Sequence, residues 1–366
     1  MRIPRRPLWP LITLILFALA GCGKDERTAS PLDTTTVEQL SRSEVDALEL
    51  TLIDSVTLGT AGESVEEITD LRIKDGKFYV LDAMAKHVRV FGRDGRLHST
   101  IGRAGKGPGE FQDAMSLAVV PEGLFVADPM RGKELSLFTE QGRFVENRAF
   151  HTPTPPTSLA SSGELIATMG LLSIKDPATE GWNVVGISTM RGDSLGTGCV
   201  LDSRFIESRK RDGRLSHFGF GTVTTRADTV YCTQGISPVV QVMDRTGRAV
   251  RQIRVAPPFY VAPTDGELKL NQKAMFDFLG TFTAMGGFTP VEGGFVSMYT
   301  RFNQEAGEIR VHLLVCRNGA PLRCGTVENI RKPVYIPTLD TVYIEEEPQA
   351  DRPARIGIYR IAKREA

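Results

Sequence analysis

The sequence feature that most constrains the fold is a tight turn that recurs six times and leads each time into a short β-rich segment. The six turns are Asp75-Gly76, Glu122-Gly123, Ser162-Gly163, Ala227-Asp228, Glu292-Gly293 and Leu339-Asp340. In five of the six repeats an alternating segment then runs to a second turn, at Asp94-Gly95, Gln141-Gly142, Arg191-Gly192, Thr246-Gly247 and Asn318-Gly319. Turns of this kind between β-rich segments predict β-hairpins.

The spacing of these turns indicates a closed repeat architecture. Two hairpins in each repeat make one four-stranded antiparallel blade, and six repeats in residues 45–366 contain about 54 residues each, slightly above the ~40–50 of typical propeller blades. We therefore predict an all-β chain whose one folded domain, at residues 45–366, is a six-bladed β-propeller.

The sixth repeat lacks its second hairpin, because the chain ends soon after the apolar segment at residues 356–361. At the other end of the domain, residues 50–58 form a strand-like segment with no hairpin partner of its own. Pairing these two segments would remove two free strand edges. We therefore predict that the N-terminal strand closes the ring.

Residues 1–21 have the anatomy of a bacterial signal peptide. Arg2, Arg5 and Arg6 form its basic region, and residues 8–20 form an apolar run that is shorter than the ~20 residues needed to span a bilayer. We expect export from the cytoplasm and removal of this segment.

The four residues Leu19-Ala20-Gly21-Cys22 resemble the lipobox of bacterial lipoproteins. The resemblance implies that Cys22 becomes the first residue and carries the acyl chains, palmitate among them, that hold the protein to a membrane. Gly23 stands where these lipoproteins often carry an Asp that retains them in the inner membrane, so the resemblance favours the outer membrane. Residues 22–44 are mostly polar and predict a flexible tether.

A second resemblance concerns the first two repeats. The stretch Ile101-Gly102-Arg103-Ala104-Gly105-Lys106-Gly107-Pro108-Gly109-Glu110-Phe111, followed by Leu124-Phe125-Val126-Ala127-Asp128, resembles the repeat of NHL-type propellers. With the lipobox, it makes the chain similar to bacterial six-bladed propeller lipoproteins. The later repeats keep the turns but lose the Gly-Pro-Gly-Glu-Phe stretch, so the resemblance implies a fold rather than an activity. We interpret its glycines as a crossing between blades that requires positive φ.

Four side chains are candidates for ligand binding. His151 and His217 each lie in a crossing just before the inner strand of a blade, and Asp70 and Asp113 lie in or near the equivalent stretches of the first two blades. Such a set could hold Ca²⁺ or Zn²⁺ and would suit a metal-dependent lyase or hydrolase of the NHL-type propeller kind. The predicted inner strands begin with small or uncharged residues, which favours binding over catalysis. We predict no cofactor, and a metal only under the catalytic alternative.

A helix is predicted to interrupt the connection from the fourth blade to the fifth. Thr264-Asp265-Gly266-Glu267 reads as a capping box, and apolar residues at helical spacing continue to Phe282. Phe276 and Phe278 in this helix are expected to contact a ligand on the face that holds the two histidines. The basic cluster Arg204, Arg209, Lys210, Arg211 and Arg214 is interpreted as a solvated loop.

Four cysteines follow Cys22. Cys316 and Cys324 flank the Asn318-Gly319 turn, so we predict that they form a disulfide across one hairpin in an oxidising compartment. Cys199 and Cys232 could pair between blades or remain two buried thiols.

The composition restricts the class of partner. Lys plus Arg and Asp plus Glu both number 44, so no basic excess favours nucleic acid. Our functional hypothesis is a monomeric, membrane-anchored binding or scaffold propeller in the cell envelope, which recognises a protein, peptide or glycan on one loop face. The metal-dependent lyase or hydrolase is the alternative.

Overall fold

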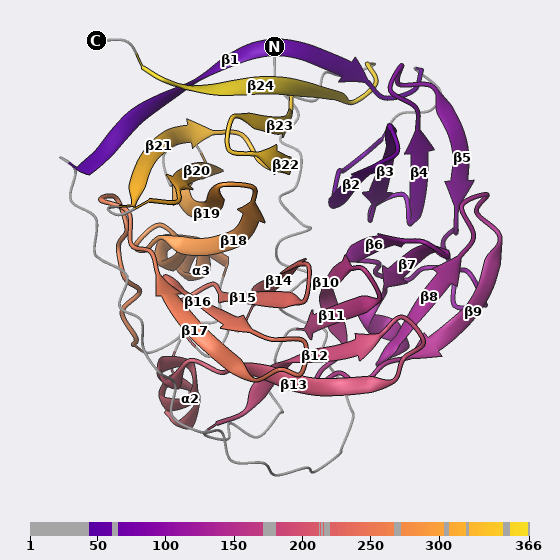
Figure 1. Ribbon diagram of the computed structural model, residues 1–366, viewed down its shortest axis with the longest axis horizontal. Coiled ribbons are helices and arrows are strands. Elements are labelled where there is room, and N and C mark those ends of the chain that lie inside the picture. Colours follow the sequence, from indigo (N-terminus) through magenta and orange to yellow (C-terminus); the bar gives the residue numbers. More distant parts are fainter. Residues whose placement is uncertain are drawn as a thin grey trace.

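The computed structural model describes residues 44–60, 65–170, 181–211, 213, 215, 220–266, 272–303, 307–319, 322–346 and 352–364. The predicted signal peptide and nearly all of the predicted tether lie outside these residues. Six four-stranded antiparallel blades are arranged in a ring, so the predicted six-bladed propeller is confirmed (Figure 1).

Each blade starts with an inner strand and ends with an outer one. Blade 1 contains β2 (Asp70–Lys74), β3 (Lys77–Asp82), β4 (His87–Phe91) and β5 (Leu97–Ile101). Blade 2 contains β6 (Ser116–Val120), β7 (Gly123–Ala127), β8 (Glu134–Phe138) and β9 (Phe144–Ala149). Blade 3 contains β10 (Pro156–Ser162), β11 (Leu165–Gly170), β12 (Asn183–Thr189) and β13 (Ser194–Val200).

Blades 4 to 6 follow the same order. Blade 4 contains β14 (Gly221–Arg226), β15 (Thr229–Gln234), β16 (Val239–Met243) and β17 (Ala249–Arg254). Blade 5 contains β18 (Ala284–Val291), β19 (Gly294–Asn303), β20 (Glu308–Arg317) and β21 (Arg323–Ile330). Blade 6 contains β22 (Pro333–Thr338), β23 (Thr341–Glu345), β24 (Arg355–Lys363) and, as its outer strand, β1 (Val45–Thr57).

The ring is closed by the N-terminal strand, as predicted. β1 runs antiparallel to β24, from the pair Leu48↔Lys363 to the pair Thr57↔Arg355. Before it reaches β24, β1 pairs in parallel with β21 over Val45–Ala47. Blades 5 and 6 therefore form one continuous eight-stranded sheet.

The glycine-rich crossing between blades 1 and 2 has the structural role that we interpreted from its sequence. Gly102 has φ +74°, and a Cβ atom built there would lie 2.3 Å from the Phe111 ring. Phe111 packs edge-on against Phe138 at a centroid distance of 5.6 Å. Glycine at this position therefore lets an aromatic ring enter the core between the two blades.

Two disulfides are present. Cys316 and Cys324 are directly opposite each other in the β20–β21 pair and are bonded, which confirms the predicted bridge. Cys199 and Cys232 are also bonded, so the disulfide holds the outer strand of blade 3 to blade 4.

The helices agree only in part with the sequence predictions. The basic cluster lies mostly in a helix, α2 (Ser203–Lys210), so its interpretation as a loop is wrong. A helix is present before blade 5, as predicted, and α3 spans Gln272–Leu279; residues 267–271, between it and the first three residues of the predicted capping box, lie outside the described residues. Asp265, in the predicted capping box, accepts a hydrogen bond from the Ser208 hydroxyl at 2.8 Å and thereby holds α2.

No helix in the described residues is long and apolar enough to cross a membrane.

Candidate functional site

One end of the ring gathers most of the irregular structure. Because the strands of each blade are antiparallel, the crossings between blades and the turns between second and third strands lie at the same end of every blade. We call this end the crossing face; it carries α2 and α3. The opposite end carries the two sets of hairpin turns, and we call it the hairpin face.

Buried aspartates fasten the crossing face in blades 1 and 2. The Asp82 carboxylate accepts a hydrogen bond from the Glu66 amide at 2.7 Å and a second from an amide of the turn after β3 at 3.0 Å. Asp128 does the same in blade 2, with the Gln112 amide at 2.7 Å and the Met130 amide at 3.0 Å. Each carboxylate thus ties the incoming crossing to the turn beside it, which makes both segments rigid.

Two methionines project from these fastened turns. Met84 and Met130 stand two positions after Asp82 and Asp128, and their exposed fractions are 56% and 49%. A large apolar side chain in water at the same place in neighbouring blades is a feature that core packing does not require. Methionine is flexible and polarisable, and it is common on surfaces that bind other proteins.

Partly buried carboxyls lie near the junction of blades 6 and 1. Burial raises the pKa of Glu67 and of Glu345, while the charge of Lys332 opposes both shifts. The Lys332 ammonium donates to the Ile68 carbonyl at 2.8 Å. In the crossing into blade 2, burial and the negative charge of Asp128 raise the pKa of the Asp113 carboxyl. The crossing face therefore carries acidic groups beside its apolar side chains.

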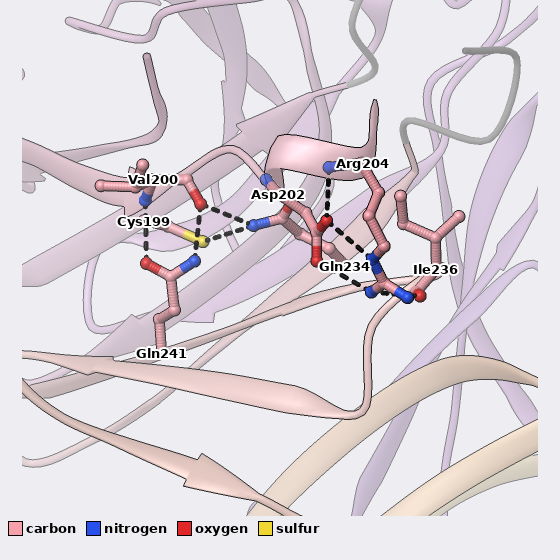
Figure 2. Close-up of polar contacts among 7 residues, drawn as sticks. All are labelled: Cys199, Val200, Asp202, Arg204, Gln234, Ile236 and Gln241. Atoms are coloured by element: carbon pink, nitrogen blue, oxygen red, sulfur yellow. Dashed lines mark hydrogen bonds and ion pairs between the residues drawn. The ribbon is translucent and has the colours of Figure 1, made fainter. Parts of the chain in front are cut away.

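A glutamine clamp positions the crossing into blade 4 (Figure 2). The Gln241 side chain accepts from the Val200 amide at 2.9 Å and donates to the Val200 carbonyl at 2.6 Å. The Gln234 side chain donates to the same carbonyl at 2.8 Å and accepts from the Asp202 amide at 2.8 Å. These contacts fix the backbone directly before Ser203, where α2 begins.

Asp202 then caps α2. Its carboxylate accepts from the Arg204 amide at 2.9 Å, and the Arg204 guanidinium bonds the same carboxylate and donates to the Ile236 carbonyl at 2.8 Å (Figure 2). Burial acts to raise the pKa of Asp202, but the hydrogen bonds and charge of Arg204 outweigh it, and the pKa lies below the ordinary value. The start of α2 is therefore held by the ion pair of Asp202 and Arg204, both of which also bond to the backbone.

Asp70 is the first residue of β2, the inner strand of blade 1. Its carboxylate accepts from the Ser116 hydroxyl at 2.8 Å and the Leu117 amide at 2.9 Å, and it pairs with Arg72 at 2.7 Å. The Ser116 hydroxyl accepts from the Leu159 amide at 3.1 Å, and Arg72 donates to the Leu159 carbonyl at 3.3 Å. This circuit joins blades 1, 2 and 3 at their inner edges.

The other predicted site residues have different positions. His151 is exposed in the crossing into blade 3. His217 and the side chain of Phe276 lie outside the described residues. The prediction that Phe278 contacts a ligand is wrong, because its side chain is 4% exposed and packs on Phe282 at a centroid distance of 5.0 Å. Its side of α3 faces the core.

Within the part of the chain that the structure describes, no three His, Cys, Asp or Glu side chains gather as a set of metal ligands.

Sequence reasoning missed the two exposed methionines. The signal was present: Met84 and Met130 each follow, by two positions, the aspartate that ends a β-rich segment. This spacing can be recognised as a surface feature only once the structure shows that the aspartate is buried and that the turn after it faces solvent.

Comparison with known proteins supports the fold. Residues 38–122 match the model of the DUF5128 family, which is described as a 6-bladed beta-propeller. A Bacteroides fragilis NCTC 9343 protein described as exported is similar in structure, with a TM-score of 0.58 at 11% identity, over 89% of this chain and 98% of that one. A Bacteroides vulgatus member of the duf4221 family has a TM-score of 0.57 at 13% identity, over 87% and 99%.

No curated protein matches the chain in sequence. At such low identities the structural similarity concerns the fold alone. Together with the six observed blades, these matches identify the chain as a six-bladed β-propeller.

Proposed function

We propose that this propeller is an extracytoplasmic binding module that presents its crossing face to a protein or peptide partner. The observation that carries the proposal is the pair Met84 and Met130, more than half and about half exposed on turns that Asp82 and Asp128 hold rigid. A rigid base lowers the entropy lost on binding, while flexible thioether side chains adapt to the partner's surface. Apolar contacts of this kind favour a protein or peptide over a glycan.

The carboxyls on the same face add specificity. The backbone amide of Asp113 is held by Asp128, and the backbone amide of Glu66, whose side chain is exposed, is held by Asp82. A partner that places apolar side chains on the methionines and a cation near these carboxyls would match the surface in both polarity and charge.

The test is site-specific photo-crosslinking in living cells. A photoreactive amino acid at Met84 or Met130 should yield a discrete crosslinked product that mass spectrometry identifies. The matched controls are Arg96 and Arg248, whose side chains are 86% and 81% exposed in turns of the hairpin face. Crosslinks that form at the control positions and not at the methionines would show that the hairpin face binds the partner.

Membrane anchoring through Cys22 is part of the same proposal. It is supported by the likeness of Leu19-Ala20-Gly21-Cys22 to the lipobox, and a structurally similar protein is described as exported. We infer an outer-membrane lipoprotein whose propeller stands off the bilayer on residues 22–44. Cys22→Ser should abolish incorporation of radiolabelled palmitate while the protein is still exported. Palmitate that still enters this variant would rule out Cys22 as the site of lipidation.

A further inference from the structure

The outer edge of blade 6 exposes two consecutive large apolar side chains, whereas the described outer edges of blades 2 and 4 expose one each, Val145 and Val250. β1 is thirteen residues long and carries Leu52 and Ile53, each 47% exposed. By contrast, the outer strand β9 carries Glu146 and Arg148, and charges of this kind keep a free edge from pairing with another chain. The exposed part of β1 lacks this protection between Glu49 and Asp54.

The backbone of β1 presents unused hydrogen-bonding groups on this edge. The Arg364 amide donates to the Ala47 carbonyl at 2.9 Å, so Ala47 belongs to a hydrogen-bonded pair with β24. Hydrogen-bonded and non-bonded pairs alternate along an antiparallel ladder. The amide and carbonyl of Leu50 and the amide of Leu52 therefore point away from β24, beyond the last pair that β1 makes with β21, and no strand among the described residues pairs with them.

A groove runs along this edge. β1 pairs with β21 only as far as Ala47↔Thr326 and then diverges from it towards β24, across the top of the ring in Figure 1. The space between the two diverging strands is a cavity of about 580 Å³, lined by residues that include Leu48, Leu50, Val327 and Ile330. Leu48, Leu50 and Ile330 are half-buried against the core of blades 5 and 6, so the groove has an apolar side.

The charge of the groove indicates what would complement it. Glu49 pairs with Arg364 at 3.9 Å, whereas Glu328 is exposed and has no ion-pair partner within the described part of the chain. A bound segment would satisfy Glu328 with a lysine or arginine and would place apolar side chains over Leu50 and Ile330.

We propose that the free edge of β1 is a second binding site, which takes an extended peptide with alternating apolar residues and a cation as an added strand of blade 6. Main-chain bonds to Leu50 and Leu52 supply the pairing, and the groove beside β21 selects the side chains. The site is independent of the crossing face, since it lies on the rim of the ring.

The test uses the purified full chain and a fluorescein-labelled synthetic peptide of about nine residues, in which valine alternates with lysine or threonine. Fluorescence anisotropy should show saturable binding to the wild-type chain. Leu52→Pro removes an outward amide without removing a bond to β24, a position where a strand tolerates proline. It should weaken binding by about tenfold or more, since an outward hydrogen bond and strand alignment are both lost.

Leu52→Val is the matched control, because it keeps the amide and an apolar side chain. It should bind within about twofold of wild type, and thermal unfolding should show that both variants fold. If Leu52→Pro does not fold, Glu328→Lys provides the second test: it should weaken the lysine peptide and improve binding of the same peptide with aspartate in place of lysine.

Three results would overturn the proposal. They are the absence of peptide binding to wild type, equal affinity of folded Leu52→Pro, and equal binding of a peptide whose pairing edge is N-methylated. A wild-type chain that sediments as a dimer without peptide, when Leu52→Pro is a monomer, would assign the edge to a second copy of this chain instead.

Discussion

Asp82, Asp128 and Gln234 perform one task with different side chains. Each lies at or directly after the end of the second strand of its blade. Its side-chain oxygen accepts a hydrogen bond from a backbone amide of the crossing that enters the same blade, and the N···O distances are 2.7, 2.7 and 2.8 Å. A buried amide without a partner is costly, so a polar side chain at this place is a structural requirement of the repeat. In blades 1 and 2 it also determines where the exposed methionines stand.

Asp128→Ala should therefore destabilise the propeller. The carboxylate accepts from the partly buried amides of Gln112, Asp113 and Met130, and its removal leaves these groups without this acceptor. We expect the free energy of unfolding to fall by about 3 kcal/mol in urea denaturation. Asp128→Asn keeps one acceptor oxygen and should lose less. A loss below about 0.5 kcal/mol for the alanine variant would contradict the role of the clamp.

Among the elements, β1 contributes most to closure. Its antiparallel pairing covers β24 from end to end, and Leu58 directly after it is fully buried. Without β1, blade 6 would have three strands, and the outer edge of β24 would be exposed.

Truncation separates the strand from the segment before it. Removing residues 1–43 should leave the thermal midpoint unchanged, because β1 is kept. Removing residues 1–58 should abolish the cooperative transition, since the strand and its apolar contacts are lost. Both measurements are made by circular dichroism on heating. Equal melting of the two truncated proteins would show that closure does not depend on β1.

The strands could be predicted from the sequence more completely than the helices, of which α3 was predicted and α2 was not. The turns and their spacing reflect the local preference of the backbone for hairpins. All six first hairpins form where their turns predict them. α2 is only eight residues long and buries Phe205 and Ile206 on one side, which is too short a pattern to distinguish from a loop. Asp265 reads locally as part of a cap, but its partner, Ser208, is 57 positions away.

At the scale of the whole molecule, two sets of buried or partly buried titratable groups have opposite effects on the stability of the fold as the pH falls. Burial raises the pKa of Glu67 and Glu345 and lowers the pKa of His87 and His312. The carboxyls are more easily protonated in the folded state than in the unfolded one, so they favour folding as the pH falls. The histidines are harder to protonate in the folded state and favour unfolding.

The carboxyl contribution is isolated by comparing wild type with a Glu67→Gln, Glu345→Gln double variant. The cost of ionising the carboxyls is complete above their raised pKa values and absent below their ordinary value of 4.5. As the pH falls from neutral through the raised pKa values towards 4.5, the urea midpoint of wild type should therefore rise relative to that of the variant. An unchanged difference between the two midpoints would show that these carboxyls ionise in the folded state as they do in water.

The candidate site depends on contacts between blades more than the fold of each blade does. Asp70 lies close to the inner strand edge, as its sequence position suggests, but the partners of its carboxylate come from blade 2 and from Arg72 of its own strand. Met84 and Met130 form a pair only because two consecutive blades present the same turn on the same face. Neither fact is contained in local sequence, because contacts between blades decide both.

The closure by β1 also determines the order in which strands can pair while the chain is being synthesised. The Arg355 side chain reaches the Ser55 hydroxyl at 2.7 Å across 300 positions of sequence. The strand made first must therefore wait, unpaired, until the strand made last has been synthesised, and contacts of such separation form slowly. During that interval the apolar edge of β1 is open to any passing strand, so the nascent chain is most vulnerable to misassembly just before it is complete.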